Sequence, residues 1–518
     1  MKPMEPMDSS QKPCLLLRRA LAALLVGTAA ASSAFAQPVH TNLGDPPPVP
    51  REMRAVWVAT VFNIDWPTTS TATTATQQTQ ARAILDRIRD TNMNAVFLQV
   101  RPSADAFYNS PREPWSEFLT GLMGRAPNPA YDPLAFWISE ARKRNIEVHA
   151  WINPYRARVA NRSTAAAANH VTNTHPHIVR DYNGMKWLDP GHADTVAYTL
   201  AAIDDIVNRY DIDGIVLDDY FYPYPDANQT PFPDSATYAA YLASGGTLSL
   251  ANWRRDNVNR FVEQAYTTVK SIKPWVRFGI SPFGIWRPGH PPGITGLDAY
   301  ASIYADSRLW LNRGWVDYFS PQLYWRINQT AQSYPRLLEW WVQENTYGRH
   351  IWPANFTSKV ADGTPSAWPA QEILDQIDRT RAQPGATGNV HYSMRPIRDN
   401  RDNIAARLKT GPYAQRALVP ASPWLATGNL SRPPIGVRHT RRNITVFLRP
   451  SIPANEVRGW VVQTLYGNTW TTEILPADTP WVTRRHVSPA GRLRAVDVSV
   501  VDRVNRQSPR SRAVPFRN

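Results

Sequence analysis

From Arg54 onward, short runs of apolar and β-branched residues alternate with longer amphipathic stretches. Parallel βα units produce this alternation, because each buried strand is followed by a helix that covers it. The predicted strands are 54-RAVWVAT-60, 95-AVFLQV-100, 147-EVHAWIN-153, 213-DGIVLDD-219, 277-RFGISPF-283, 316-VDYFSPQLYW-325, 351-IWPANF-356 and 389-NVHYSM-394. Eight strands that alternate with helices predict an α/β fold, a (β/α)8 TIM barrel.

The segments between these strands carry helical periodicity. Residues 132–145, 194–210 and 254–273 are predicted helices, and in the second of them Val196 and Leu200 begin an apolar face at helical spacing. An open doubly wound sheet is the main alternative to the barrel, but it would place a glycine-rich turn after the first strand. The stretch that follows that strand here contains no glycine, so the barrel is favoured.

After about residue 415 the pattern changes to short alternating runs. They are 443-NITVFLRP-450, 457-VRGWVVQTL-465, 469-TWTTEIL-475 and 494-RAVDVSVVD-502. Such runs predict a small all-β sandwich of the fibronectin type III or immunoglobulin-like kind. We expect the barrel to occupy residues 51–415, a Pro-rich linker residues 416–434, and the sandwich residues 435–518.

The N-terminal 36 residues have the organisation of a secretory signal peptide. Basic residues precede the apolar run 20-ALAALLVGTAAA-31, and 34-AFA-36 supplies small residues for cleavage. The apolar run is too short to span a bilayer, and the single cysteine, Cys14, lies before it. We therefore expect cleavage of residues 1–36, a linker over residues 37–50, and a bacterial protein that is periplasmic or secreted without a permanent membrane anchor.

Composition limits the class of partner. The apolar fraction of 43% can fill a sizeable core, and the net charge of +15 suggests an anionic partner. The Lys and Arg residues are dispersed instead of forming a dense stripe, which argues against nucleic acid. An acidic cell-wall polymer fits the charge, and a merely basic, solvated surface fits it equally well.

Polar and aromatic residues gather where the predicted strands end. The C-terminal ends of barrel strands meet at one face, where chemistry occurs. Rings stack on the apolar faces of sugars, while carboxylates, amides and guanidinium groups bind sugar hydroxyls, so we predict a polysaccharide site. Its candidates are Asp65, Arg101, Asp105, Asn153, Tyr155, Arg156, Asp218, Asp219, Tyr220, Tyr222, Trp286, Gln322, Tyr324, Trp325 and Asn355, with Asp189 from a loop.

The stretch 213-DGIVLDDYFYPYP-225 ends a strand on two adjacent carboxylates walled by rings. Glycoside hydrolysis needs an acid for the leaving oxygen, and a second carboxylate or the substrate's own N-acetyl group at the oxocarbenium-like centre. Rings can raise the pKa of one carboxyl while its neighbour stays ionised. Because side chains alternate along a strand, we favour Asp218 as the principal catalytic residue, with Asp219 and Asp105 for the second role. A turn or helix cap is the structural alternative.

The sequence motifs give little indication of a metal or cofactor site. His149, His175, His177 and His192 form neither an HxxxH pair on a helix nor an HxH at a strand end. The polar segment 157–186 reads as a loop. There is no phosphate loop and no GxSxG elbow. We expect no metal and no cofactor, and interpret the histidines as structural.

Long motifs in order identify a family resemblance. They are 54-RAVWVATVFNIDWP-67, 97-FLQVRPSADAFYNS-110, 114-PWSEFLTG-121, 148-VHAWINPYR-156, 187-WLDPG-191, 213-DGIVLDDYFYP-223, 279-GISPFGIWR-287 and 317-DYFSPQLYW-325. This set is similar to the glycosyl-hydrolase-like family 10 proteins. The resemblance implies a (β/α)8 barrel in an exported bacterial protein. One member of that family is a divisome-associated lipoprotein that cuts peptidoglycan strands lacking stem peptides, which implies a cell-wall glycan substrate and cell-division or wall-associated partners.

The fourth strand is also similar to that of family 18 chitinases, which read DGxDxDxEYP. Asp213 and Asp218 match the first and last aspartates, but Tyr220 stands at the position of the catalytic glutamate. The general acid then comes from the fourth strand, from Asp105, or from a loop residue such as Asp189 or Glu113. Two hypotheses follow: a glycoside hydrolase of peptidoglycan strands, or a non-catalytic wall-glycan-binding scaffold with a degenerate barrel.

Overall fold

The computed structural model describes residues 43–162 and 164–515. The predicted signal peptide, residues 1–36, and Cys14 lie outside this part of the chain. From Asp45 on, the described residues belong to one compact unit. No helix among them combines the length and the apolar character needed to cross a membrane.

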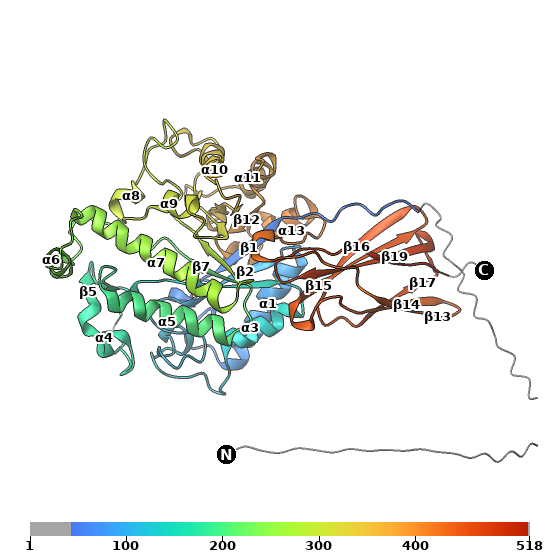
Figure 1. The fold of residues 1–518 in the computed structure, drawn as a ribbon, viewed down its shortest axis with the longest axis horizontal. Coiled ribbons are helices and arrows are strands. Elements are labelled where there is room, and N and C mark those ends of the chain that lie inside the picture. The colour runs from blue at the N-terminus through green and yellow to red at the C-terminus, as the bar shows by residue number, and fades with distance from the viewer. Residues whose placement is uncertain (1–42, 163, 516–518) are drawn as a thin grey trace, which may run out of the picture. The chain divides into compact units, whose positions relative to one another are not determined.

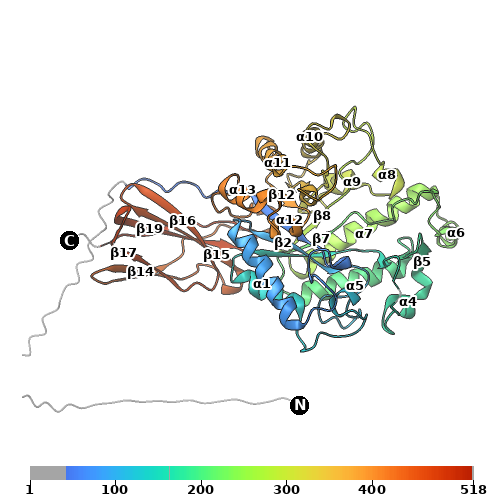
Figure 2. The same ribbon diagram turned by 180° about the vertical axis from the view of Figure 1, so that it is seen from behind.

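Short, buried, parallel strands form the central sheet (Figures 1 and 2). Its order is β10-β9-β8-β7-β3-β2-β1-β12-β11. The strands are β1 (Met53–Val58), β2 (Ala95–Arg101), β3 (Glu147–Ile152), β7 (Gly214–Leu217), β8 (Arg277–Ile280), β9 (Tyr318–Phe319), β10 (His350–Ile351), β11 (Ala354–Asn355) and β12 (Gly388–His391). They correspond to the eight predicted strands, each shorter than or close to its predicted range.

The sheet closes on itself through an interrupted strand. β10 and β11 are two halves of one strand, separated by Trp352 and Pro353. Proline has no N–H to donate to a ladder, so regular pairing stops there. β10 pairs with β9 and β11 pairs with β12, which joins the two ends of the row. The predicted (β/α)8 barrel is therefore confirmed.

Rings set against glycines fill the barrel interior. Trp57, Trp151 and Tyr318 belong to one buried cluster. A Cβ added to Gly279 would lie 2.2 Å from the Tyr318 ring, and one added to Gly214 would lie 2.4 Å from a ring nitrogen of a neighbouring histidine. The small residues therefore make room for large side chains on adjacent strands, and the packed interior supports the strand ends above it.

Helices cover the outside of the barrel, and the long helices α5 and α7 lie side by side there (Figures 1 and 2). All three predicted helices are confirmed, as α3, α5 and α7. Asp132 caps α3 as its side chain accepts a hydrogen bond from the Ala135 N–H at 3.0 Å, and Pro133 occupies the first turn. The helices are α1 (Thr74–Asp90), α2 (Glu117–Thr120), α3 (Pro133–Arg142), α4 (Val171–Thr174), α5 (Ala193–Arg209), α6 (Ser235–Ala243), α7 (Leu250–Ile272), α8 (Ala299–Ser302), α9 (Ser307–Asn312), α10 (Tyr334–Gln343), α11 (Ala370–Ala382), α12 (Met394–Arg398) and α13 (Ile404–Thr410).

The connection from β3 to α5 carries a small sheet. β4 (Arg156–Arg158), β6 (Met185–Leu188) and β5 (Val179–Tyr182) form a three-stranded antiparallel arrangement, here called the insert sheet. The prediction of a loop over this polar segment was therefore wrong. Its strands are half-exposed, so their pattern lacks the strong apolar alternation of a core strand.

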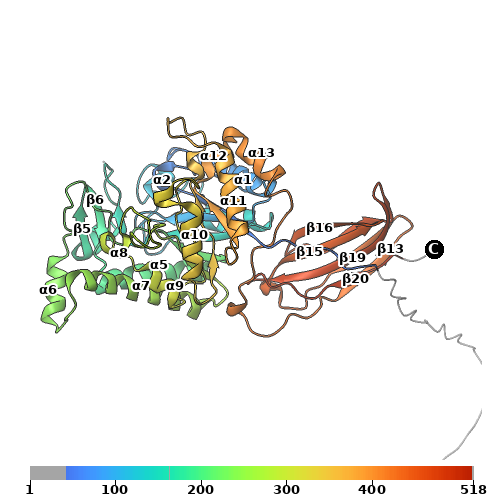
Figure 3. The ribbon, with the colours of Figure 1, turned by 90° about the horizontal axis from the view of Figure 1, so that it is seen from above.

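The C-terminal strands form antiparallel sheets (Figure 3). One has the order β13-β14-β17, and the other is built on β16-β15-β19. Side chains from both pack into one core, in which Ile444 and Val446 meet Trp460 and Val498, so the predicted sandwich is confirmed. Its boundaries at residues 415 and 434 stay predictions. The strands are β13 (Ile435–His439), β14 (Asn443–Leu448), β15 (Val457–Tyr466), β16 (Thr469–Pro476), β17 (Trp481–Arg485), β18 (Val487–Ser488), β19 (Gly491–Asp502) and β20 (Ser511–Ala513).

Candidate active site

A cavity of about 290 Å³ lies at the C-terminal ends of the barrel strands. Residues that end or follow strands from around the barrel line it, so the fold brings distant parts of the chain together here. Among the described residues, the carboxylates that line it are those of Asp218 and Asp219. The lining residues are Trp57, Trp151, Asp218, Asp219, Tyr220, Tyr224, Ser281, Phe283, Gln322, Tyr324, Phe356 and Tyr392.

A larger cavity, of about 510 Å³, lies at the other end of the barrel. Glu52 and Arg54 line it beside the start of β1, and Gly388 lines it at the start of β12. Catalytic residues of this fold lie at the C-terminal ends of the strands, whereas the N-terminal face contributes to stability. The smaller cavity is therefore the candidate active site.

Asp218 follows β7 and is almost fully buried. The Trp151 Nε1–H donates to its Oδ2 at 2.9 Å, and Asn153 Nδ2 donates to its two oxygens at 3.1 and 3.2 Å. Burial raises the pKa of Asp218 to about 6; the Arg156 charge and these two donors oppose the rise, whereas the Asp219 charge adds to it. The carboxyl group can therefore exchange a proton under mildly acidic conditions.

Asp219 meets a different set of partners although it is adjacent in the chain. Burial raises its pKa, while hydrogen bonds from the Tyr224 hydroxyl and the Gln322 carboxamide lower it. Gln322 Nε2 also donates to the Ser281 carbonyl oxygen at 3.1 Å, which fixes the amide across the cavity. The two carboxyl groups are thus held separately, by opposite sides of the barrel mouth.

Tyr220 lines the cavity, and Arg156 lies against it. The Arg156 guanidinium carbon lies 4.3 Å from the centre of the Tyr220 ring, in a cation–π contact. Arg156 begins the first strand of the insert sheet, so this sheet carries the positive charge that favours ionised Asp218. Tyr220, which replaces the chitinase glutamate, contributes a ring and a hydroxyl group but no carboxylate.

An aromatic wall stands opposite these groups. The Tyr324 ring stacks on Phe356 with centroids 4.8 Å apart, and Tyr392 lies 5.7 Å from Tyr324. Trp57 is buried, and its Nε1–H has no hydrogen-bond partner among the described residues. Stacked rings beside a free buried donor suit a sugar, which has apolar faces and hydroxyl acceptors.

Five predicted site residues line this cavity: Asp218, Asp219, Tyr220, Gln322 and Tyr324. Two others, Asn153 and Arg156, act on Asp218 from behind it.

Asp65, Arg101 and Asp105 are buried away from the cavity lining. Asp65 accepts hydrogen bonds from the Ala59 and Arg395 N–H groups, which joins the loop after β1 to helix α12, and burial raises its pKa to about 6. Arg101 is paired with Glu113 at 2.7 Å. Asp105 accepts the Ser103 N–H at 2.9 Å, and burial raises its pKa to about 7. Their contacts support loop structure.

The remaining predicted residues also lie outside the lining. Asp189 pairs with Arg180, the Asn355 amide donates to Gln376, and the Trp286 Nε1–H donates to Asp306. Trp325 packs edge-on against Phe283, which does line the cavity. The two others are the buried rings of Tyr155 and Tyr222.

Sequence reasoning missed several lining residues. Trp57 and Trp151 lie one residue before the ends of β1 and β3, and residues with such large rings are usually interpreted as core. Phe356 and Tyr392 directly follow the strands β11 and β12. The available signal was position: each lies within one residue of the last residue of a strand. Tyr224, which donates to Asp219, lay within the quoted aromatic run.

Known proteins resemble this chain in sequence. The glycosyl hydrolase-like 10 family model matches residues 52–361. "Glycosyl hydrolase YngK" of Bacillus subtilis (strain 168) is 38% identical over 415 residues, 79% of each chain. "Glycosyl hydrolase DigH" of Escherichia coli (strain K12) is 35% identical over 367 residues, which cover 66% of this chain and 82% of the relative.

Solved structures with some likeness to the chain are less similar in sequence. The PgaB (BpsB) glycoside hydrolase domain from Bordetella bronchiseptica is 14% identical, with a TM-score of 0.47, over 72% of this chain and 100% of that domain. The endo-beta-1,4-mannanase from Thermotoga petrophila is 9% identical, with a TM-score of 0.42, over 90% of this chain and 98% of the other.

The family match and the two relatives agree with the motif order in the sequence. The family model covers more than half of the chain, and the relatives exceed 30% identity. The chain therefore belongs to the glycosyl hydrolase-like 10 family and is an enzyme of the glycoside hydrolase class, as its motifs predicted.

Proposed function

We propose that the protein hydrolyses the glycan backbone of peptidoglycan, with strands that lack stem peptides as its preferred substrate. One observation carries the proposal: two adjacent, buried carboxyl groups end β7 inside a cavity walled by rings. Glycosidases need acidic groups of this kind beside a sugar platform. We place the enzyme in the periplasm or outside the cell, with cell-division or wall-associated proteins as partners.

Asp218 is the principal catalytic residue in this proposal, and its role is that of the general acid. The negative charge of Asp219 disfavours ionisation of Asp218, so Asp218 keeps its proton to a higher pH than it would alone. It gives this proton to the glycosidic oxygen as the bond from that oxygen to the anomeric carbon breaks. The proton lost from Asp218 thereby completes the hydroxyl group of the departing sugar.

The developing positive charge at the anomeric carbon needs a partner. Asp219 is the second carboxylate of the cavity and fills this role, either directly or by orienting the substrate's N-acetyl group. A water molecule then adds its oxygen to the anomeric carbon and gives one proton to Asp218, which restores the acid form. Burial raises the pKa of Asp219, and its hydrogen bonds from Tyr224 and Gln322 oppose this rise by stabilising the ionised form. Asp105, the other candidate, is less suited because it does not line the cavity.

Charge supports an anionic wall glycan as the substrate, and the peptide-free strand is one. Removal of the stem peptide leaves a free lactyl carboxylate on every second sugar, so the stripped strand is a polyanion. The chain has a net charge of +15, which attracts such a polymer. The rings of Tyr324, Phe356 and Tyr392 then stack on a sugar, and the free Trp57 N–H donates to one of its oxygens.

A wall-glycan-binding scaffold is the second candidate. The observation that favours it is Tyr220, which stands where the family 18 chitinases have their catalytic glutamate. In that case the cavity would bind glycan without cleaving it. An enzyme would release glycan products in a reaction that depends on Asp218, whereas a scaffold would release none.

The Asp218→Asn variant separates these functions. We expect it to lower kcat/KM on stripped glycan about 10²- to 10⁴-fold, the usual contribution of a general acid, while glycan pull-down stays at the wild-type level. Asp181→Asn, an exposed aspartate in the insert sheet, is the matched control and keeps full activity. A wild-type protein that retains glycan without releasing products would establish the scaffold.

A further inference from the structure

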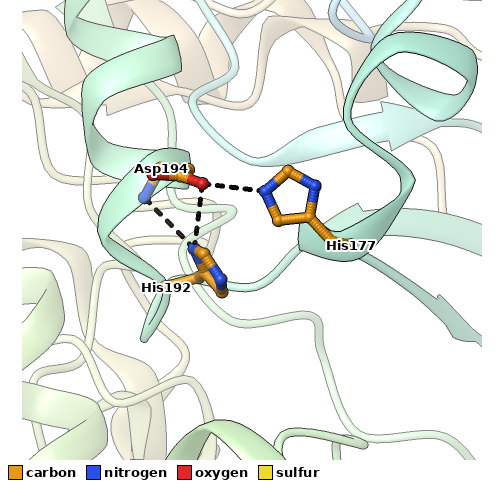
Figure 4. Close-up of side chains that lie close together, drawn as sticks. All are labelled: His177, His192 and Asp194. Carbon is orange, nitrogen blue, oxygen red and sulfur yellow. Dashed lines mark hydrogen bonds and ion pairs between the residues drawn. The ribbon is translucent and has the colours of Figure 1, made fainter.

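Three side chains with metal-ligand atoms meet outside the catalytic cavity, as Figure 4 shows. His177 lies in the short 3-10 turn Pro176–Ile178, which leads into β5 of the insert sheet. His192 is the N-cap of α5, and Asp194 lies in the first turn of that helix. The hairpin of β5 and β6 thus brings the sequences HPH and HAD together.

The three ligand atoms lie close to one another. His177 Nε2 is 2.8 Å from Asp194 Oδ2, and His192 Nδ1 is 3.9 Å from the same oxygen. One ligand atom from each residue lies within 4.8 Å of the other two. Around a tetrahedral zinc ion with bonds of about 2.0–2.1 Å, neighbouring ligand atoms are about 3.3 Å apart. Small side-chain rotations therefore suffice to bring all three onto one ion.

Exposure makes these rotations possible. The side chains of His177, His192 and Asp194 are 51%, 31% and 56% exposed. Two forces oppose a cation here: His192 Nδ1 already accepts the Asp194 N–H at 3.2 Å, and the N-terminus of α5 carries partial positive charge. The negative charge of the Asp194 carboxylate offsets the partial positive charge of the helix N-terminus. We therefore expect weaker binding than at a closed structural zinc site.

We propose that His177, His192 and Asp194 bind a transition-metal ion of the zinc class. Imidazole nitrogens with one carboxylate suit Zn²⁺, Ni²⁺ and Cu²⁺, whereas Mg²⁺ and Ca²⁺ prefer sets of oxygen ligands. A solvent molecule completes the tetrahedron. His175, whose ring centre lies 6.1 Å from that of His177, is near enough to replace it after a rotation.

The metal would fasten the insert sheet to α5. This sheet begins with Arg156, which contacts Tyr220 at the cavity edge, and its Trp187 Nε1–H donates to the Phe221 carbonyl oxygen at 2.9 Å. The ion therefore steadies an element that borders the active site without taking part in hydrolysis. This proposal differs from the expectation drawn from the motifs. The motifs indicated that these histidines are structural and that the chain has no metal site.

Isothermal titration of the untagged exported chain with Zn²⁺ tests the proposal. We expect about one equivalent to bind to the wild type. His177→Ala or Asp194→Asn should raise the dissociation constant for Zn²⁺ at least tenfold. His290→Ala, which removes an exposed histidine from another loop, is the matched control and keeps the wild-type affinity. Equal Zn²⁺ binding by the wild type and by both site variants would overturn the proposal.

Co²⁺ supplies a second readout that does not depend on stability. A site with two imidazoles, a carboxylate and water gives tetrahedral Co²⁺ absorption in the visible range, and we expect this absorption in the wild type and in His290→Ala. Loss of the bands in His177→Ala, with an unchanged circular dichroism spectrum, would assign them to this site. Bands that persist in His177→Ala would place the ion elsewhere and refute the assignment.

Discussion

Asp218 and Asp219 show how two adjacent, identical side chains acquire different environments. Asp218 shares the strand face of Gly214 and Val216, which points into the barrel, and it meets Trp151 and Asn153. Asp219, the next residue, lines the same cavity but meets Tyr224. Strand alternation predicts different directions for the two side chains, and that stays a prediction, because both line the cavity. The donors to Asp218 follow or belong to β3, which the motif around Asp218 does not contain.

The pH dependence of hydrolysis follows from the role of Asp218. Its acid form is the active one, so activity is present below its pKa of about 6 and is lost as the pH rises through that value. Asp219→Asn removes the neighbouring negative charge, which lowers the pKa of Asp218. The residual activity of this variant should therefore decline at lower pH than that of the wild type.

Arg156→Gln should have the opposite effect on the pH profile of kcat/KM. The Arg156 charge favours ionised Asp218, so its removal raises the pKa of Asp218 and moves the decline to higher pH. Asp105 also has a raised pKa, of about 7, and Asp105→Asn is therefore the control that should leave the profile unchanged. A profile that moves only in Asp105→Asn would transfer the acid role to that residue.

At the element scale, the barrel strands could be predicted because both of their faces are buried and their apolar runs are continuous. Strands β13 and β17 were missed since each presents a largely exposed pattern, with Val482 the buried residue of β17. The proposed metal ligands could not be grouped from the sequence for a different reason. His177 and His192 meet only because the residues between them form a hairpin, and that segment reads as a loop.

Packing between strands β8 and β9 yields a stability prediction. Gly279→Ala places a methyl group against the Tyr318 ring inside the barrel, and we expect it to cost about 1–3 kcal/mol of unfolding free energy. Gly436→Ala is the matched control, because its Cβ would meet Phe447 at an ordinary 3.5 Å. Urea unfolding measures both, and equal midpoints for the two variants would contradict the packing account.

At the scale of the whole molecule, a buried ion pair lies at the N-terminal end of the barrel. Glu147 contacts Arg277 at 2.8 Å and accepts a hydrogen bond from Asn505 near the C-terminus at 2.8 Å. Burial opposes ionisation of Glu147, but the Arg277 charge, with other donors, outweighs it and lowers the pKa of Glu147. The pair thus ties the barrel to the segment that follows the sandwich strand β19.

Glu147→Gln should destabilise the protein by about 3–5 kcal/mol at pH 7, because it leaves the Arg277 charge buried without its partner. The folded-state pKa of Glu147 is lowered, so its stabilising effect is present above about pH 4.3, the value for an unfolded glutamate, and is lost as the pH falls below it. The difference between variant and wild type should therefore shrink in acid. Glu263→Gln, on an exposed face of α7, is the control, and an equal loss there would contradict this account.

The central claim is that the carboxyl pair of the ring-walled cavity cleaves glycan strands. The most direct test incubates residues 37–518 with purified peptidoglycan, before and after an amidase has removed the stem peptides, and identifies soluble products by mass spectrometry. The account predicts disaccharide-ladder fragments from the stripped glycan that are absent with Asp218→Asn. Intact stripped glycan after incubation with the wild type, or the same fragments from the variant, would contradict it.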